Sequence, residues 1–470
     1  MHTKRIIFLL IFGLLAACQQ EPTPIQENSD VTTSPPDTVE ETASASLSAN
    51  VSPIMSPPAE STRQPATAAS QSTLTAPAGQ IFLPLASHSE TAIPATTPMP
   101  TETAVGSTVV PSTPRPAYPP YDGPPIPRSN IGIQIHIHQE DQRDIIRHLQ
   151  ALDVGWVKEQ VSWKVYEPQQ GQYAADRFDE LDRLVEAANN HGIQVLLSVS
   201  KAPEWSRATT AMDGPPTDYS HFQNFMHMLA SRYQGQVAAY ELWNEPNLQR
   251  EWNGTPLNAT DLVNLIAQGS AGVRAGDPAA LIISAAPATT GINDGVVAID
   301  DRVFLRQMLD AGVGNMVDGI GAHPYGWANP PDGSSTDANQ TAPSHNDHPS
   351  FFFADTLQDY SVILAEYGFA DKQIWVTEFG WGSFESFDAL PPPGAEFMTA
   401  VSEWQQAEYI QAAYAQTLDN EQIGPMILWN LNFAPTLGPE YSESGYSILR
   451  TDGSRRPSYR VLEHLPKIVE

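Results

Sequence analysis

From about residue 128 to the C-terminus, short apolar segments alternate with amphipathic helical segments, and this alternation limits the possible fold more than any other feature. The segments with the length and composition of buried strands span residues 131–138, 156–161, 194–200, 237–243, 281–286, 319–323, 374–378 and 426–430. The segments in which apolar residues recur at helical spacing span residues 179–189, 222–233, 262–275, 303–309, 360–367 and 403–418.

Eight strands that alternate with helices over about 340 residues predict an α/β fold, a closed (β/α)8 TIM barrel. A doubly wound open sheet shows the same alternation and is the competing architecture. No glycine-rich phosphate-binding turn follows the first strand, which removes the main reason to prefer the open sheet.

The segment before the barrel has a different composition. Residues 18–127 are rich in Ser, Thr and Pro, and much of the chain's total of 42 Pro residues lies there. Such a segment buries too little apolar surface to offset the entropy lost on ordering. We therefore expect residues 1–17 to be a signal peptide, residues 18–127 a disordered tether, and residues 128–470 the catalytic domain.

The N-terminus carries the pattern of an exported protein. Lys4 and Arg5 precede an apolar run over residues 6–15, which is too short for a membrane-spanning helix. Cys18 follows at a position that resembles a bacterial lipobox. Because it is the chain's only cysteine, no intrachain disulfide is possible. This pattern predicts lipidation of Cys18 and membrane anchoring outside the cytoplasm, at the cell surface or in the periplasm. The alternative is an ordinary signal peptide with a chance cysteine.

The overall charge excludes some partners. The net charge is −30, which repels phosphate backbones, so we expect no nucleic-acid partner. Neutral sugars are compatible with an acidic surface. We expect a monomer.

Two carboxylates lie at the ends of separate predicted strands. Glu245 follows the apolar strand 237–243, where Pro246 ends it, and Glu378 ends the strand 374–378. In a barrel these ends meet at the face that carries the chemistry. Paired carboxyl groups are what acid-assisted cleavage of a glycosidic bond requires.

The motifs that surround these two residues resemble those of the clan A retaining glycoside hydrolases, nearest to families 39 and 5. The matching segments, within about residues 128–465, are Trp243-Asn244-Glu245-Pro246, Thr377-Glu378-Phe379-Gly380, Ala322-His323-Pro324-Tyr325, Trp429 and the tail at 445–450 and 456–459. The resemblance implies a retaining hydrolase that cleaves β-glycosidic bonds without a cofactor, with Glu245 as acid/base and Glu378 as nucleophile. We then expect carboxyl groups about 5–5.5 Å apart. We also expect the pKa of Glu245 to be raised by the second carboxylate and an apolar rim.

Other polar and aromatic residues also fall at the ends of predicted strands. The candidates for substrate contact are Asn244, His323, Tyr325, Trp429, Trp205, Trp381, Trp327, His136, His138, Lys201 and, just beyond a strand, Glu204. Asn244 can donate to a sugar 2-hydroxyl, Tyr325 can donate to the nucleophile, and His323 can bind substrate or brace Glu245. The alternative for each tryptophan is core packing, and for Lys201 a solvated loop charge.

Two further patterns have interpretations of their own. Alternation puts Lys158 on one face of the segment 156–161, and puts Glu241, Trp243 and Glu245 on one face of the segment 237–243 and the residues that follow it. Lys158 and Glu241 can then form a buried ion pair inside the barrel, with a structural role. The run His345-Asn346-Asp347-His348 could ligate a metal, but it lies in a long polar loop, 329–350, so we expect no metal there and a loop that forms one wall of the cleft.

Three functions fit the sequence. The first is a retaining glycosidase that acts on a polysaccharide or oligosaccharide, and a transglycosylase would share every residue named. The second is a non-catalytic glycan-binding lipoprotein on the same scaffold. The third is a structural envelope protein, which the clustered polar residues at the strand ends argue against. The sugar, its linkage and endo or exo action do not follow from the sequence.

Overall fold

The computed structural model describes residues 116–138, 140–337 and 342–469. The predicted signal peptide, the predicted lipidation site at Cys18 and most of the predicted tether lie outside these residues. Within the described ranges no helix combines the length and the apolar character needed to cross a bilayer.

Eight parallel strands close into a barrel in which each strand pairs with the next and the last pairs with the first. They are β2 (Ile131–Ile135), β3 (Trp156–Ser162), β4 (Gln194–Ser200), β5 (Ala239–Leu242), β6 (Leu281–Ser284), β7 (Gly319–Ala322), β8 (Gln373–Phe379) and β9 (Ile423–Leu428). The predicted TIM barrel is confirmed, and each predicted strand corresponds to one strand of the barrel.

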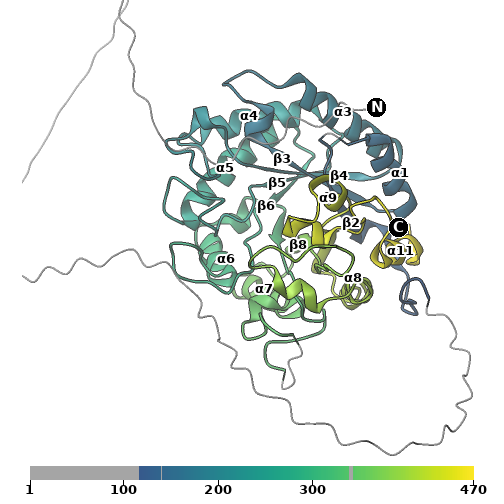
Figure 1. The fold of residues 1–470 in the computed structure, drawn as a ribbon. Coiled ribbons are helices and arrows are strands. Elements are labelled where there is room, and N and C mark those ends of the chain that lie inside the picture. The colour runs from purple at the N-terminus through teal and green to yellow at the C-terminus, as the bar shows by residue number, and fades with distance from the viewer. Residues whose placement is uncertain (1–115, 139, 338–341, 470) are drawn as a thin grey trace, which may run out of the picture. The chain divides into compact units, whose positions relative to one another are not determined.

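Helices cover the outside of the barrel, and Figure 1 shows the strands at the centre of this ring. The longer helices are α1 (Gln142–Leu152), α3 (Ala175–Asn190), α4 (Ser220–Arg232), α5 (Ala259–Gly276), α6 (Asp301–Asp310), α7 (Phe353–Glu366), α8 (Glu403–Gln416) and α11 (Pro457–His464). The shorter elements are α2 (Trp163–Tyr166), α9 (Phe433–Leu437), α10 (Ser442–Tyr446) and the 3-10 turns η1 (Arg128–Asn130), η2 (Glu204–Ser206), η3 (Val313–Asn315), η4 (Pro349–Phe351) and η5 (Glu396–Ala400).

The barrel interior changes from apolar to polar along the strands. A separate apolar cluster, formed by inward-facing residues of six strands, comprises Trp156, Leu196, Ala239, Ile283, Trp375 and Ile427. Two residues further along three of these strands, on the same face, lie Lys158, Ser198 and Glu241, all fully buried. The N-terminal end of the barrel interior is therefore filled by apolar side chains. A buried polar layer lies between these side chains and the C-terminal strand ends that carry the site.

A two-stranded parallel pair lies before the first barrel strand. In it β1 (Ile126–Pro127) pairs with β10 (Lys467–Ile468), and the ring of Tyr118 stacks on His464 with centroids 4.8 Å apart. These contacts join Tyr118 and β1 to the C-terminal segment of the chain. Because β1 leads into the start of β2, the pair lies at the end of the barrel opposite the strand C-termini.

Candidate active site

The segment after β5 leaves the regular strand at once and positions Glu245. Trp243 and Glu245 have φ angles of 85° and 43°, in the left-handed region that residues other than glycine seldom adopt. The backbone N–H of Glu245 donates to the carbonyl of Ala286 at 3.1 Å, which ties this turn to the end of β6. Strain of this kind persists where the surrounding structure enforces it, often at functional sites.

The same backbone turn corrects one sequence-based expectation. Simple alternation put Trp243 on the inward face with Glu241 and Glu245. The structure instead packs its ring against Phe222 of α4 and Trp252, with centroids 5.8 Å away in each case. Its positive φ breaks the alternation, so Trp243 belongs to the layer between the barrel and its helices.

Glu378 lies near the end of β8, where the strand is irregular. The pairing of β8 with β9 shifts register between Ile374 and Val376 and again between Val376 and Phe379. Irregularities of this kind re-aim side chains next to active sites. The carboxylate of Glu378 is directed into the barrel mouth and is 7% exposed.

The two carboxylates share one site. One oxygen of Glu245, one oxygen of Glu378 and a ring nitrogen of His323 all lie within 4.8 Å of one another. Retaining glycosidases keep their two carboxyl groups about 5–5.5 Å apart, whereas inverting enzymes separate them by about 6.5–9.5 Å to admit a water molecule. The close approach fits the retaining geometry.

Three donors hold the Glu378 carboxylate. The ammonium of Lys158 lies 3.0 Å from Oε1, and the phenol of Tyr325 donates to Oε2 at 2.8 Å. Gln134 also donates to Oε1 at 3.1 Å when its amide is oriented to accept the indole N–H of Trp429 at 3.2 Å, the arrangement that satisfies both neighbours. Three donors fix the orientation of this carboxylate, as a nucleophile requires.

Lys158 connects this carboxylate to the polar layer below it. Its ammonium lies 3.1 Å from Oε2 of Glu241, which is the buried pair expected from the sequence, and it also contacts Glu378. Burial by itself lowers the pKa of Lys158, but the charges of Glu241 and Glu378 outweigh it and raise the pKa. The lysine is thus a permanent cation between two carboxylates, and its role reaches beyond the structural one predicted.

Glu245 is held by two cations. Its Oε1 lies 3.2 Å from Nδ1 of His323, and its Oε2 lies 3.1 Å from Nη2 of Arg250. Burial raises the pKa of Glu245, but His323 and Arg250 overcome that effect and lower the pKa to about 2. The expectation of a raised pKa is therefore wrong for the empty site, because the sequence did not reveal how close these two cations lie.

His323 lies between both carboxylates and is fully buried. Its Nδ1 is 3.2 Å from Glu245 and 3.8 Å from Glu378. Burial lowers the pKa of this imidazole, but the charges of Glu378 and Glu245 more than compensate, so its pKa is raised. The imidazole is therefore favoured in its charged form, within hydrogen-bonding distance of Glu245.

The trio of Glu245, His323 and Glu378 has donor atoms close enough for a metal ion. Lys158 and Arg250 already neutralise the two carboxylates and would repel a cation. The arrangement favours proton transfer over metal binding. In the run 345–348, which was considered as a metal motif, His345 stacks on Trp327 with ring centroids 4.2 Å apart. His348 accepts a hydrogen bond from the backbone N–H of Ser350.

Three of the candidate tryptophans lie beyond the ends of different barrel strands and are half-buried. Trp429, just after β9, is half-buried, with its ring centroid 5.9 Å from Tyr325 and 5.1 Å from Tyr446. Trp205 is half-buried and donates its indole N–H to the carbonyl of Glu167 at 3.0 Å. Trp327 is half-buried in the loop after β7. These rings keep part of their surface exposed, as a sugar platform must.

Trp381 does not. Its ring is 1% exposed, packs against Phe353 and Phe379, and donates its N–H to the carbonyl of Asn329 at 2.7 Å. A ring enclosed in this way offers no face to a sugar, and this corrects the expectation that Trp381 contacts substrate.

The remaining candidates lie at different distances from the chemistry. Asn244 is buried beside Glu245, and its carbonyl oxygen has no hydrogen-bond partner in the described part of the chain. His138 bonds Glu180 of α3 at 2.6 Å, and its ring meets His136 edge to face. Lys201 lies 3.7 Å from Asp213. No bond to Glu245, His323 or Glu378 is recorded for these last three side chains, and Glu204 is an exposed residue of η2.

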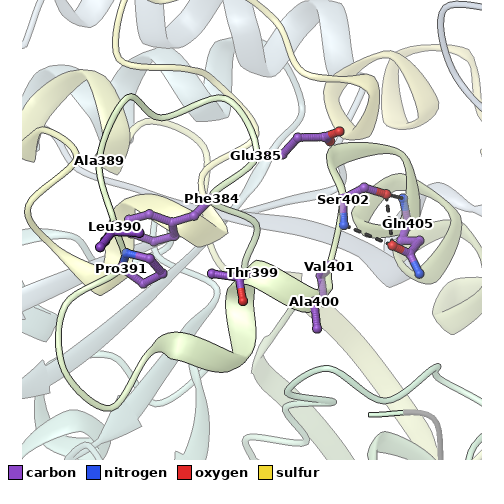
Figure 2. Close-up of a pocket in the computed structure, with 10 residues that line it drawn as sticks. All are labelled: Phe384, Glu385, Ala389, Leu390, Pro391, Thr399, Ala400, Val401, Ser402 and Gln405. Carbon is purple, nitrogen blue, oxygen red and sulfur yellow. Dashed lines mark hydrogen bonds between the residues drawn. The ribbon is translucent and has the colours of Figure 1, made fainter. Parts of the chain in front are cut away.

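A cavity of about 360 Å³ lies beside the site but does not contain it. Figure 2 shows its walls, formed by the loop after β8 with Phe384, Leu390 and Pro391, and by the segment that leads through Ser402 to Gln405 of α8. Neither carboxylate of the trio lines it. The reaction site is therefore the open barrel mouth, and this cavity belongs to the loops around it.

Three functional contacts were absent from the sequence reading. Gln134 lies in the otherwise apolar segment Ile131–Ile135, and a lone amide in a buried strand signals a polar partner. Lys158 is likewise a polar residue in a buried strand, β3, and this indicates that it needs a polar partner such as Glu378. Arg250 gave none, because exposed arginines are common in loops.

The fold and the site together define a class of protein. A (β/α)8 barrel with two facing carboxylates at the ends of separate strands is the architecture of the retaining glycoside hydrolases. The sequence profile of the Cellulase family (glycosyl hydrolase family 5) matches residues 122–433, and the chain belongs to this family. No curated protein matches the sequence.

Solved structures share the fold. A family 39 glycoside hydrolase from Bacteroides cellulosilyticus WH2 superposes with a TM-score of 0.55 at 20% identity, over 73% of this chain and 64% of that one. A glucosidase from Croceicoccus marinus gives a TM-score of 0.50 at 16% identity, over 73% of this chain and 68% of that one. This chain thus spans less than two thirds of the family 39 enzyme, and the likeness is one of fold.

Proposed function

We propose that this protein hydrolyses β-glycosidic bonds in an oligosaccharide or polysaccharide with retention of configuration. Glu378 is the nucleophile and Glu245 the acid/base. The observation that carries the proposal is the approach of these two carboxylates to within 4.8 Å of each other at the barrel mouth. Membership of a glycosyl hydrolase family supports it.

In the first step the Glu378 carboxylate attacks the anomeric carbon while the bond to the leaving oxygen breaks. Glu245 gives a proton to that oxygen, and His323, whose Nδ1 lies 3.2 Å from Glu245, can supply that proton. In the second step Glu245 takes a proton from water, the water oxygen bonds the anomeric carbon, and Glu378 leaves as the carboxylate. Atoms and protons balance over the two steps, and Glu245 ends protonated again.

The surrounding residues have roles that follow from their positions. Lys158 and Tyr325 stabilise Glu378 as the anion both before attack and when it leaves. Asn244 carries a buried amide whose carbonyl has no partner, beside the acid/base, where it can bond the sugar next to the broken linkage. Trp429 lines the same side and offers a sugar face.

A panel of 2-fluoro glycosides, read by intact mass and peptide mapping, tests the proposal. Such compounds trap the glycosyl-enzyme, so we expect a covalent adduct on Glu378 with one sugar of the panel, which also identifies the substrate class. Gluco-, xylo- and manno-configured probes are the first to try, since the matched family is described as cellulase and a structural neighbour as a glucosidase.

Two substitutions separate the roles. Glu378→Gln should abolish turnover and labelling while the circular dichroism spectrum and melting temperature stay close to those of the parent. Glu245→Ala should spare substrates with an activated leaving group far more than natural ones. Binding of glycans by a parent protein that neither labels nor turns over any probe would favour the non-catalytic glycan-binding alternative.

We also propose that the enzyme works outside the cytoplasm, attached to the membrane by a lipid on Cys18. The support is the N-terminal sequence pattern, in which Lys4 and Arg5, an apolar run and Cys18 follow one another. A tether of about 100 residues reaches roughly 55 Å as a random coil, which would let the barrel reach insoluble or large substrates.

A further inference from the structure

Arg250 occupies an unusual place for a surface arginine. It lies five residues after Glu245, between β5 and α5, and its side chain is 68% exposed. Its guanidinium nevertheless contacts Oε2 of the acid/base at 3.1 Å. The other oxygen, Oε1, faces His323, so both oxygens of the general acid are occupied in the empty site.

A general acid must present one of its oxygens to the leaving group. His323 is fully buried and cannot move aside without unpacking the barrel mouth. Arg250 is 68% exposed, and it is therefore the group that an incoming substrate can displace.

A second carboxylate is positioned to receive the guanidinium. Glu251 is largely buried, and its Oε1 lies 3.9 Å from Nε of Arg250. Its Oε2 is buried and has no hydrogen-bond partner within the described residues. A buried carboxylate oxygen without a donor is a costly arrangement unless a partner arrives in another state of the site.

We propose that Arg250 is a positioning residue that holds Glu245 in the empty site and moves to Glu251 when the leaving-group part of a substrate binds. The proposal rests on the proposed function. In this exchange, protonation of Glu245 depends on bound substrate. Glu245 then takes up its proton only when a leaving group is present to receive that proton.

The charges around both carboxylates agree with this exchange. His323, Arg250, Glu251, Tyr325 and Tyr446 are the charged or titratable groups that act on Glu245. Burial raises the pKa of Glu251 to about 7. The charge of Glu245 also raises this pKa, whereas Lys201 and Arg250 lower it. A shift of the guanidinium from Glu245 to Glu251 brings its charge to the carboxyl that lacks a partner and leaves Glu245 able to accept the proton that His323 can donate across 3.2 Å.

A third acidic residue, Glu443, also acts on the charge of Arg250. Burial lowers its pKa, but Glu245, Glu251 and Glu443 of α10 raise it more strongly, so the guanidinium stays charged in either position. The exchange therefore moves a fixed charge and requires no change in the protonation of Arg250.

The test compares Arg250→Gln with Arg250→Lys, which keeps the charge. Both are measured as kcat/KM against pH with phenyl and 2,4-dinitrophenyl glycosides of the sugar found with the fluoroglycoside panel. The alkaline limb of the phenyl profile reports loss of the proton that the coupled pair of Glu245 and His323 holds in the free enzyme. Loss of the neighbouring cation in Arg250→Gln should move this limb up by about 1 pH unit, and Arg250→Lys should leave it in place.

Glu251→Gln supplies the opposite change. It removes the receiving carboxylate, so turnover of the phenyl glycoside should fall more than turnover of the dinitrophenyl glycoside, which needs little acid assistance. An unmoved alkaline limb in Arg250→Gln, or equal effects of Glu251→Gln on both substrates, overturns the proposal. If that happens while Glu378→Gln is inactive, the proposed function stands and only the role of Arg250 fails; full activity of Glu378→Gln would refute the proposed function itself.

Discussion

At the scale of single residues, Lys158 is the charge on which the nucleophile depends. It is fully buried between Glu241 and Glu378. Lys158→Met should leave two buried carboxylates without a cation, which costs about 3–5 kcal/mol of unfolding free energy. It should also move the acid limb of kcat/KM to higher pH, because an unpaired buried Glu378 holds its proton more tightly. Urea unfolding and a pH–rate profile measure the two effects.

A double variant separates stability from catalysis. In Lys158→Met/Glu241→Gln the second carboxylate is neutral, so much of the lost stability should return while the acid limb stays displaced. Recovery of the parent profile in the double variant would contradict a direct role of Lys158 on Glu378 and leave the lysine a structural counterion for Glu241 alone.

His136 makes the stability of the domain depend on pH. Burial, assisted by the nearby His138, lowers its pKa from 6.5 to about 4. The folded state then binds fewer protons than the unfolded state between these values, so its contribution is fully present above pH 6.5 and is lost as the pH falls toward 4. The loss is up to about 3 kcal/mol. His136→Gln should flatten the slope of unfolding free energy against pH over this window, measured in urea.

The exposed His191→Gln serves as the control, since it should leave that slope unchanged. An equal slope in His136→Gln and the parent would show that other groups cause the acid sensitivity.

How far the sequence could predict single residues depended on how local their signals are. Glu245 and Glu378 were found because a strand end and a proline or glycine mark them in a few residues of sequence. Arg250 was missed because its contact with Glu245 depends on a positive φ and a loop path that no short pattern encodes. The same turn misplaced Trp243, and burial in a dense aromatic layer misassigned Trp381.

At the scale of elements, the barrel strands were predictable because buried parallel strands are continuous apolar runs. The helix α1 was overlooked although Ile145, Leu149 and Leu152 mark a helical face and Asp141 caps its start. The pair β1 and β10 could not be predicted, because two-residue strands carry no periodicity and form only when the chain's distant ends meet.

That pair provides a prediction at the same scale. The backbone N–H of Ile126 donates to the carbonyl of Pro466 at 2.9 Å, and Ile126 is fully buried. Ending the chain at Leu465 should uncover Ile126 and lower the unfolding free energy by about 2–4 kcal/mol. Because the pair lies at the end opposite the site, kcat/KM at 25 °C should not change. Removal of 469–470 alone is the control, and a large activity loss in the longer truncation would contradict the separation.

At the scale of the whole molecule, all the residues proposed for catalysis lie in the barrel, between Gln134 and Trp429. The catalytic proposal therefore involves no residue of the N-terminal segment, for which we propose a role in membrane attachment. The net charge of −30 would weaken adhesion of the protein to anionic surfaces.

Placement can be tested independently of chemistry. In a bacterial host with a lipoprotein pathway, the parent should sediment with membranes and be released by detergent, because a lipid on Cys18 would add a strong apolar anchor. Cys18→Ser removes the only thiol that could carry that lipid, so activity should move to the soluble fraction. Gln20→Ala, two residues away, should remain with the membranes. Since the barrel is untouched, kcat/KM on a soluble substrate should be equal in all three proteins. Membrane retention of Cys18→Ser would show that some other part of the chain holds it there, and the anchor at Cys18 would have to be abandoned while the catalytic proposal stands.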